Sequence, residues 1–213
     1  MRRGRKRVEN PATARRILAA AEQQFAAQGM AGARTDEIAA AAHANKAMLY
    51  YYFGDKRRLH RAVLENLLQE LPNGASAKPV PSVGSARDRL LKSVAAYFDF
   101  LATHPNYPRL LQREAMQSGR KFDWIVRKYL RPFHNGFIRT IEQGIASGEI
   151  RRVDAHHATF TIIGATTSYF AAAPILSEVA GHNLLAPHAV AARKRALLDF
   201  VEHGLLRKGL KPR

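Results

Sequence analysis

One short stretch of the chain concentrates side chains that could hydrogen-bond to a polyanion. Residues 45–53 read Asn-Lys-Ala-Met-Leu-Tyr-Tyr-Tyr-Phe, so an amide, an ammonium group and three phenol hydroxyls lie close together in sequence. Donors of this kind contact phosphate oxygens and the edges of bases in nucleic acids. The chemistry that this stretch indicates is therefore recognition, not bond making.

The other reactive side chains form no catalytic or metal-binding pattern. The chain has no cysteine, which removes thiolate ligands and cysteine nucleophiles. His156 and His157 are adjacent, and on a helix they would point about 100° apart. His104 precedes Pro105, which is typical of a helix end, and no phosphate-binding glycine motif is present. We expect no catalytic residue, no metal ion and no cofactor, and an enzyme is the least favoured alternative.

The elements that must position residues 45–53 form a helix-turn-helix. A short Ala-rich helix begins at Thr35, and a second helix follows a three-residue turn. Thr35 and Asn45 are expected to cap these helices, while the small Ala39 and Ala42 let them approach closely. The residues expected to seal both helices onto a preceding helix are Ile38, Leu49, Phe53, Leu18 and Phe25.

Helical periodicity recurs along the rest of the chain, and strand-like alternation is nearly absent. We therefore predict an all-α fold. Asp55 and Asp154 are placed to cap the helices at 56–71 and 155–173. Pro132 is placed to bend the helix at 122–147, and Pro174 to kink or end the helix at 155–173. The expected helices cover about 11–29, 56–71, 86–103, 107–117, 122–147, 155–173 and 187–206.

The one clear break in composition is the Pro, Gly and Ser-rich stretch 72–85, which we interpret as a loop. We predict a basic flexible arm over 1–10, a three-helix DNA-binding domain over 11–56 and a larger C-terminal helical domain over 57–213. The arm either remains solvated or enters a minor groove of DNA.

The formal net charge of +17 indicates a polyanionic partner. Residues 1–71 hold 13 Lys and Arg against 7 Asp and Glu, and residues 72–213 hold 21 against 10, so the charge is spread over the chain and does not locate the binding surface. The arm lacks the apolar segment of a signal peptide, and no apolar run is long enough to span a membrane. We expect a cytoplasmic protein without a membrane partner.

Residues 12–65 resemble the TetR family of transcriptional regulators. The resemblance rests on the Leu-Tyr-Tyr-Tyr-Phe-Gly-Asp-Lys run at 49–56, on Thr35, Ile38 and Ala39 upstream of it at the family's spacing, and on Gly29. The sequence departs from the family at the turn, where His43-Ala44-Asn45 replace Gly-Val-Ser. Glycine tolerates a positive φ, and histidine does so less readily.

The resemblance, together with side-chain chemistry, implies a set of DNA contacts. Lys46 is the main candidate for a guanine or phosphate contact, and Ala47 and Met48 could meet thymine methyl groups. Tyr52 and Phe53 are interpreted as core. The predicted DNA-binding residues are Thr35, Asn45, Lys46, Ala47, Met48, Tyr50, Tyr51 and Lys56.

The resemblance also implies that the C-terminal domain binds an inducer and forms a homodimer. An anionic or acyl-type ligand would suit the basic second part of the chain. The predicted ligand-binding residues are Arg113, Glu114, Trp124, Arg127 and Phe133. The predicted dimer residues are Ile162, Thr166, Tyr169, Val190, Leu197, Val201 and Leu205, with filling of the monomer core as the alternative.

The function indicated is that of a sequence-specific regulator, most simply a repressor released from its operator by a small molecule. Its partners would be a palindromic double-stranded operator, a second copy of the chain and an unidentified inducer, because two helix-turn-helix copies bind half-sites about one DNA turn apart. The alternative within DNA binding is an architectural protein that responds to no small molecule.

Overall fold

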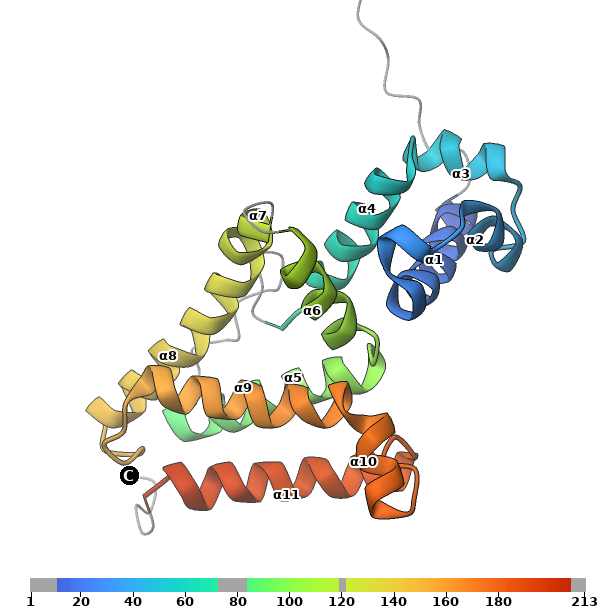
Figure 1. The fold of residues 1–213 in the computed structure, drawn as a ribbon. Coiled ribbons are helices and arrows are strands. Elements are labelled where there is room, and N and C mark those ends of the chain that lie inside the picture. The colour runs from blue at the N-terminus through green and yellow to red at the C-terminus, as the bar shows by residue number, and fades with distance from the viewer. Residues whose placement is uncertain (1–10, 73–83, 119–121, 208–213) are drawn as a thin grey trace, which may run out of the picture. The chain divides into compact units, whose positions relative to one another are not determined.

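The structure, a computed structural model, describes residues 11–72, 84–118 and 122–207 (Figure 1). Within these ranges the regular elements are helices, apart from one isolated bridge between Ile150 and Leu206, so the predicted all-α fold is confirmed. The elements are α1 (Pro11–Gly32), α2 (Thr35–Ala41), α3 (Lys46–Phe53), α4 (Lys56–Gln69), α5 (Ala86–Thr103), α6 (Tyr107–Ser118), α7 (Asp123–Ile125), a π-helical segment (Val126–Leu130), α8 (Arg131–Ala146), α9 (Ala155–Ala171), α10 (Ala173–Ala180) and α11 (Pro187–Leu205).

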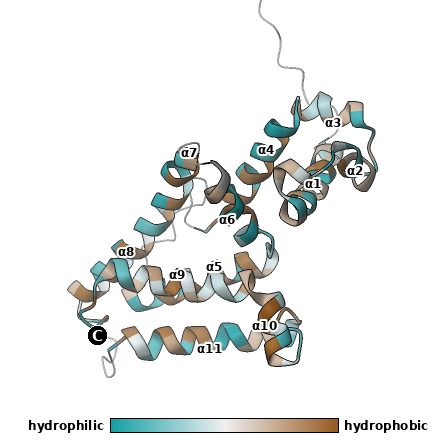
Figure 2. Ribbon diagram, in the orientation of Figure 1, coloured by the Kyte–Doolittle hydropathy of each residue, from teal (hydrophilic) through white to brown (hydrophobic). Residues whose placement is uncertain are grey.

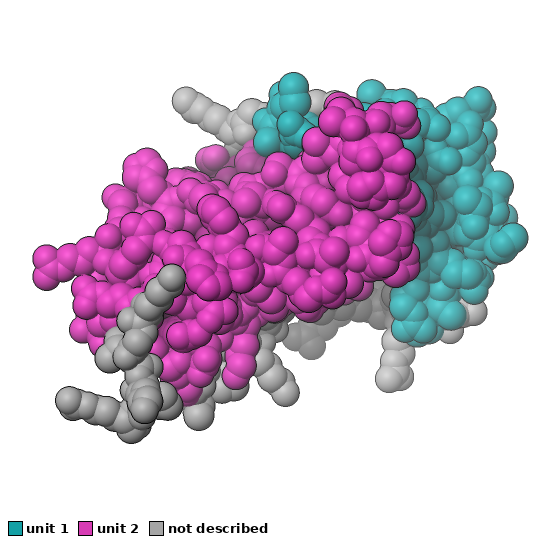
Figure 3. Space-filling model, turned by 90° about the horizontal axis from the view of Figure 1, so that it is seen from below, with its two compact units in different colours: residues 1–67, 109–117 teal, residues 68–108, 118–213 magenta. Residues whose placement is uncertain are grey.

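The chain divides into two compact units, which Figure 3 colours separately. Unit 1 comprises residues 1–67 and 109–117, and unit 2 comprises 68–108 and 118–213. Helices α4 and α6 each contribute residues to both units. The predicted arm at 1–10 lies outside the described residues, as does most of the predicted loop at 72–85. The predicted boundary between 56 and 57 stays a prediction.

Unit 1 is built on the apolar face of α1. Ile17, Ala21 and Phe25 are completely buried there, and α2 and α3 pack against this helix. At Gly29 the backbone leaves the helical path with φ 70° and ψ 174°, which is the position where the sequence predicts the end of the first helix. A glycine adopts this conformation without the steric penalty of a Cβ atom.

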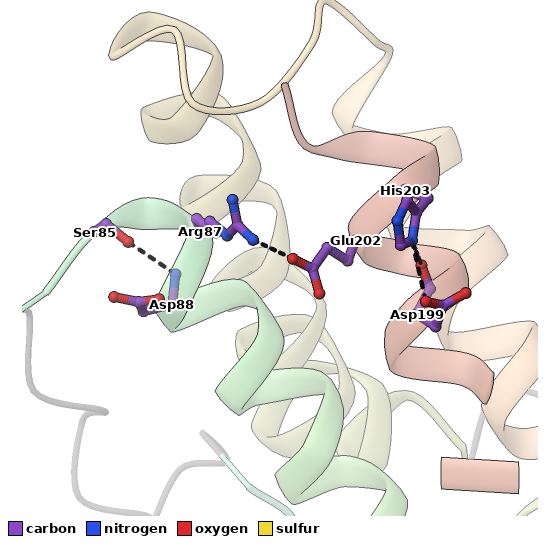
Figure 4. A network of polar contacts seen from close by, with 6 residues as sticks. All are labelled: Ser85, Arg87, Asp88, Asp199, Glu202 and His203. Atoms are coloured by element: carbon purple, nitrogen blue, oxygen red, sulfur yellow. Dashed lines mark hydrogen bonds and ion pairs between the residues drawn. The ribbon is translucent and has the colours of Figure 1, made fainter. Parts of the chain in front are cut away.

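In unit 2, α5 packs against α8, α9 and α11. Ser85 caps α5, with its hydroxyl oxygen accepting a hydrogen bond of 3.0 Å from the amide of Asp88. Arg87, in the first turn of α5, pairs with Glu202 near the end of α11 (Figure 4). The pair of Arg87 and Glu202 joins two helices that are distant in sequence.

Two expectations about helix ends are confirmed and one is wrong. The carboxylates of Asp55 and Asp154 each accept a backbone amide at 2.8 Å at the start of α4 and α9. Thr35, in contrast, does not cap α2. It is the first residue of the helix, Arg34 holds the cap position, and no side chain makes a cap hydrogen bond there.

Proline shapes two irregular places in unit 2. A π-helical segment (Val126–Leu130) immediately precedes Pro132, where the sequence predicts only a bend. At Pro174 the chain turns by 74° between α9 and α10. The sequence predicts that the preceding helix ends or kinks here. It does not predict α10, which has Pro174 in its first turn, where proline is well tolerated.

The described helices were also compared with the length and hydropathy of membrane spans. No single helix in the described ranges is long and apolar enough to cross a membrane, whereas the bent pair α9 and α10 passes by length and composition alone.

Candidate nucleic-acid interface

The turn between α2 and α3 is tight. The amide of His43 donates to the carbonyl of Ala40 at 3.0 Å, and the amide of Ala44 donates to the carbonyl of Ala39 at 2.9 Å. His43 has φ 50° and is the one non-glycine residue with positive φ in the described part of the chain. The turn therefore contains a residue with the positive φ that glycine adopts readily, and in this chain that residue is His43.

Asn45 begins α3. Its side-chain oxygen accepts a hydrogen bond of 2.7 Å from the amide of Met48, so the predicted cap is confirmed. The capping interaction fixes the side chain of Asn45 at the exposed N-terminus of α3. Backbone amides at such a terminus attract phosphate oxygens.

A single residue anchors α3 in the core of unit 1. Leu49 is completely buried, and α3 has no other buried residue. Lys46 and Ala47 are exposed, and the exposed fractions of Tyr50 and Tyr51 are 42% and 51%. Most of the helix surface therefore remains free to contact another molecule.

The sealing residues are less uniformly buried than the sequence predicts. Ile38 and Leu49 are completely buried, whereas Leu18 and Phe53 are half-buried. Tyr52 is half-buried as well, and its ring packs edge-on against Tyr51 at 5.3 Å. The expectation that Tyr52 and Phe53 are core residues is therefore only partly met, because α3 is short and rests on Leu49.

The structure brings together two predicted phosphate contacts, Thr35 and Tyr50. Their hydroxyl oxygens lie 3.3 Å apart and form a hydrogen bond between the start of α2 and the middle of α3. Thr35 is buried at 9% exposure. The bond ties the two helices together.

Lys56 has a partner in the chain. Its Nζ donates to the carbonyl of Ala31, near the end of α1, at 3.1 Å. An ammonium group has three donors, so this bond leaves others for a phosphate. The bond also fixes the start of α4 against α1.

The sequence did not predict a role at this site for two arginines, Arg16 and Arg34. Nε of Arg16 donates to the carbonyl of Ala42 at 3.0 Å and so holds the end of α2 on α1. Arg34 is exposed and pairs with Asp36 at 3.1 Å. A hydrogen bond from the backbone amide of Asp36 and the charge of Arg34 both lower the pKa of Asp36. The helical pattern gave no signal for the contact of Arg16, because it depends on how α1 and α2 are arranged.

Two sequence profiles match the chain. The profile described as "Bacterial regulatory proteins, tetR family" matches residues 17–63, which contain α2, the turn and α3. The profile described as "Tetracyclin repressor-like, C-terminal domain" matches residues 87–201, more than half of the chain. The chain belongs to the TetR family. The predicted resemblance and the two-part organisation of helices that it implied are confirmed.

Individual transcriptional repressors are similar over part of the chain. The HTH-type transcriptional repressor SCO4008 of Streptomyces coelicolor is 43% identical over 108 residues, 51% of this chain and 52% of the relative. The HTH-type transcriptional repressor NicS of Pseudomonas putida is 34% identical over 103 residues, 48% of each chain. The chain thus matches about half the length of these two relatives.

Solved structures match over nearly the whole chain. A regulatory protein of the tetR family from Rhodococcus RHA1 has a TM-score of 0.69 and 26% identity, and the match covers 90% of this chain and 98% of the other. The ketosteroid transcriptional regulator KstR2 of Mycobacterium tuberculosis has a TM-score of 0.74 at 20% identity, with 95% and 98% covered. At 20% identity, the similarity to KstR2 concerns the fold alone.

The five predicted ligand residues of this TetR-family chain fall in different units. Arg113 and Glu114 belong to unit 1, where Arg113 donates to the carbonyl of Ala27 and Glu114 lies 3.8 Å from the ring nitrogen of the buried His60. Burial lowers the pKa of His60, and the charge of Glu114 opposes that effect. Within unit 1, both residues hold α6 against its neighbours.

The other three predicted ligand residues lie in unit 2. Arg127 is exposed and pairs with Asp123 at 3.7 Å. Trp124 packs edge-on against the buried Tyr129, with ring centroids 6.1 Å apart. Phe133 is buried, and its ring centroid lies 4.8 Å from that of Tyr97. Trp124 and Phe133 are thus part of an aromatic interior, and Arg127 is a surface residue.

Five of the seven predicted dimer residues are buried in the single chain, as the alternative of a filled monomer core would require, and their place at a dimer surface stays a prediction. The residues buried in this way are Ile162, Thr166, Tyr169, Leu197 and Val201. Val190 and Leu205 are half-buried. The large apolar side chains that α9, α10 and α11 leave exposed are Phe160, Ile175, Leu176, Val179 and Phe200.

Proposed function

We propose that the protein is a dimeric repressor that binds a palindromic DNA operator and releases it when a small molecule binds unit 2. The observation that carries the proposal is the presentation of α3. Leu49 fixes this helix in the core, and its exposed side bears Lys46, Tyr50 and Tyr51. A helix held in this way can enter a major groove while its hydroxyl groups contact the flanking phosphates.

The predicted DNA contacts fit this role by position and chemistry. Asn45 and Lys46 lie at the N-terminus of α3, where recognition helices contact bases. Tyr50 and Thr35 form a hydroxyl pair that can donate to a phosphate at the edge of the groove. Arg34 adds an exposed guanidinium group beside Thr35, and we propose it as a further phosphate contact.

The dimer surface that we propose is the exposed apolar face of α9 and α11. Phe160 and Phe200 are 61% and 65% exposed. Phe200 also lines an open pocket of about 430 Å³ with Ile162, Ala165 and Leu205. An aromatic side chain next to an apolar pocket is the arrangement that a two-fold axis can make self-complementary. The hydrophobic α10, with Ile175 and Val179 exposed, adds to the apolar surface of unit 2 (Figure 2).

A repressor of this kind acts where the DNA is, so we place it in the cytoplasm. We propose that it has no enzymatic activity, since membership of a regulatory family supports a binding function. An architectural DNA-binding role is the alternative that the following experiment separates.

The test is selection from a pool of random duplexes by the purified chain at fixed salt. We expect a palindromic site that binds about a thousandfold or more tightly than random DNA. Equal affinity for selected and random duplexes would support the architectural role and contradict the repressor.

Lys46→Ala then tests the proposed surface on the selected duplex. It should weaken binding about tenfold or more, because a good base contact is worth about 1–3 kcal/mol. The control is Lys92→Ala, which removes an exposed lysine of α5 and should change affinity less than about twofold. Equal effects of the two variants would reject the assigned role of Lys46.

A further inference from the structure

The π-helical segment Val126–Leu130 presents an unusual residue to the interior of unit 2. A π-helical turn is rare and often marks a functional site. Its position here has a local cause, since Pro132 cannot donate to the carbonyl of residue 128 and its ring would collide with that carbonyl in a regular helix. Within this turn Tyr129 is completely buried.

The hydroxyl of Tyr129 has no hydrogen-bond partner among the described residues, although the atom is buried. Three other buried side-chain atoms lack a partner in the same ranges, in Gln24, His134 and Arg193, but those side chains are not fully buried. An unpaired buried hydroxyl is destabilising, and a phenylalanine would fill the same space without that cost. The tyrosine is therefore better explained by a partner that arrives from outside.

The ring of Tyr129 contacts an aromatic ring and a cation, and further aromatic rings follow in α8. Nζ of the exposed Lys128 lies 4.9 Å from the centroid of the Tyr129 ring. Trp124 meets the ring of Tyr129 edge-on. Phe133 and Phe137, on the helix that follows, are buried with ring centroids 5.3 Å apart, and Tyr97 of α5 packs on Phe133. Flat rings stack on or meet edge-on with other flat rings, so this interior suits a molecule that itself contains a ring.

The interior next to Phe133, around Tyr97, disfavours negative charge. Burial raises the pKa of Tyr97 to about 12, although its hydroxyl is 2.7 Å from that of Thr167, a contact that opposes the shift. Burial and the neighbouring Tyr97 raise the pKa of Tyr107 well above its ordinary value. Burial that raises the pKa of a phenol disfavours its charged form, and the same burial would disfavour a carboxylate ligand.

We propose that Tyr129 is the polar anchor of the ligand site in unit 2, and that the ligand is a neutral, ring-containing molecule with an oxygen that accepts a hydrogen bond from this hydroxyl. The proposal rests on the proposed function, in which a small molecule binds unit 2. The neutral ligand proposed here differs from the anionic or acyl-type ligand expected from the basic second part of the chain. The net charge of the surface does not determine which ligand the interior of unit 2 favours.

The experiment titrates the full chain with prodan, a neutral naphthyl ketone whose fluorescence reports an apolar, hydrogen-bonding environment. The comparison probe is anilinonaphthalene sulfonate, which has a similar ring system and a negative charge. We expect one prodan per chain, with a blue-shifted emission, and weaker binding of the sulfonate. Absence of saturable prodan binding overturns the proposal, and so does tighter binding of the sulfonate at the same site.

Tyr129→Phe is the decisive variant. It should weaken prodan binding about fivefold to tenfold, as expected for one lost hydrogen bond, while the melting temperature of the probe-free protein stays the same or rises. Met116→Ser, at an exposed apolar side chain of α6, is the control for probe bound at the surface and should leave the affinity unchanged. Unchanged prodan affinity in Tyr129→Phe, or a lower melting temperature without the probe, overturns the proposal.

The duplex selection described above keeps the two proposals separate. If the protein selects a palindromic duplex but prodan does not bind, the inference about Tyr129 fails and the repressor function stands. If no duplex is selected, the proposed function fails whatever the prodan titration gives.

Discussion

His43 adopts a backbone conformation, with φ 50°, that costs an L-residue about 1–2 kcal/mol. It lies in the turn that sets the angle between α2 and α3, so any strain there acts on the presentation of the recognition helix. The adjacent Ala44 has no such conformation. The pair therefore offers a test of strain at neighbouring positions in one turn.

We predict that His43→Gly raises the free energy of unfolding by up to about 1 kcal/mol, because glycine relieves the strain but adds entropy to the unfolded chain. Ala44→Gly is the matched control and should lower that free energy by about 0.5–1 kcal/mol, since it adds only entropy. Urea denaturation measures both. Equal losses in the two variants would mean that His43 is not strained.

At this scale, local interactions could be predicted from sequence and distant ones could not. The caps by Asn45, Asp55 and Asp154 involve an amide three residues away, so residue type and position suffice. The hydroxyl pair of Thr35 and Tyr50 joins residues that are 15 apart, and its formation replaced the predicted cap. This contact depends on the angle between α2 and α3, and no pattern in the sequence predicts that angle.

At the scale of elements, the apolar spacing predicts the long helices well. It fails where helices depart from regularity. The π-helical segment has the sequence Val-Arg-Lys-Tyr-Leu, which a regular helix could also have. Helix α10 contains Pro174 in its first turn, and the sequence alone indicates this proline only as a helix breaker. Close approach between elements is equally hidden, as Gly144 in α8 illustrates. A Cβ atom at this position would lie 2.4 Å from Cδ1 of the buried Ile150 and 3.2 Å from Cβ of Ala86.

We predict that Gly144→Ala lowers the free energy of unfolding by about 1–3 kcal/mol, the usual cost of overpacking. The clash should disappear when Ile150→Ala removes the opposing side chain. In that background Gly144→Ala should be neutral or stabilising, because alanine is the better helix former by about 1 kcal/mol. A double-mutant cycle by denaturant unfolding measures the coupling. Additive effects would show that Gly144 is not needed for this approach.

At the scale of the whole molecule, periodicity shows that a helix has an apolar face but does not show what covers it. Ile162, Thr166 and Leu197 of α9 and α11 were predicted to meet a second chain, and the single chain already buries these three side chains. Phe160 and Phe200 fall on the remaining sides of these helices. Phe160 lies between Thr159 and Thr161, and Phe200 lies between Asp199 and Val201, so hydrophobicity along the sequence does not distinguish these two residues from core residues.

Phe200→Ser tests the proposed dimer surface. A side chain that is 65% exposed in one chain would gain about 1–2 kcal/mol on burial by a partner. A two-fold interface contains this residue twice. The substitution should therefore weaken the dimer by about 2–4 kcal/mol, or roughly 30- to 1,000-fold in the dissociation constant. Analytical ultracentrifugation over a concentration series measures this change.

Met116→Ser is the matched control, because Met116 is 81% exposed but lies on α6. It should leave the dimer unchanged, and neither variant should disturb folding, since both side chains are at the surface. Loss of the dimer should also weaken binding to the selected duplex at nanomolar protein, because one helix-turn-helix copy then contacts only one half-site. A Phe200→Ser protein that dimerises like the wild type would move the interface away from this face of α11. Binding that weakens together with dimerisation would instead link the exposed phenylalanine of unit 2 to recognition by α3.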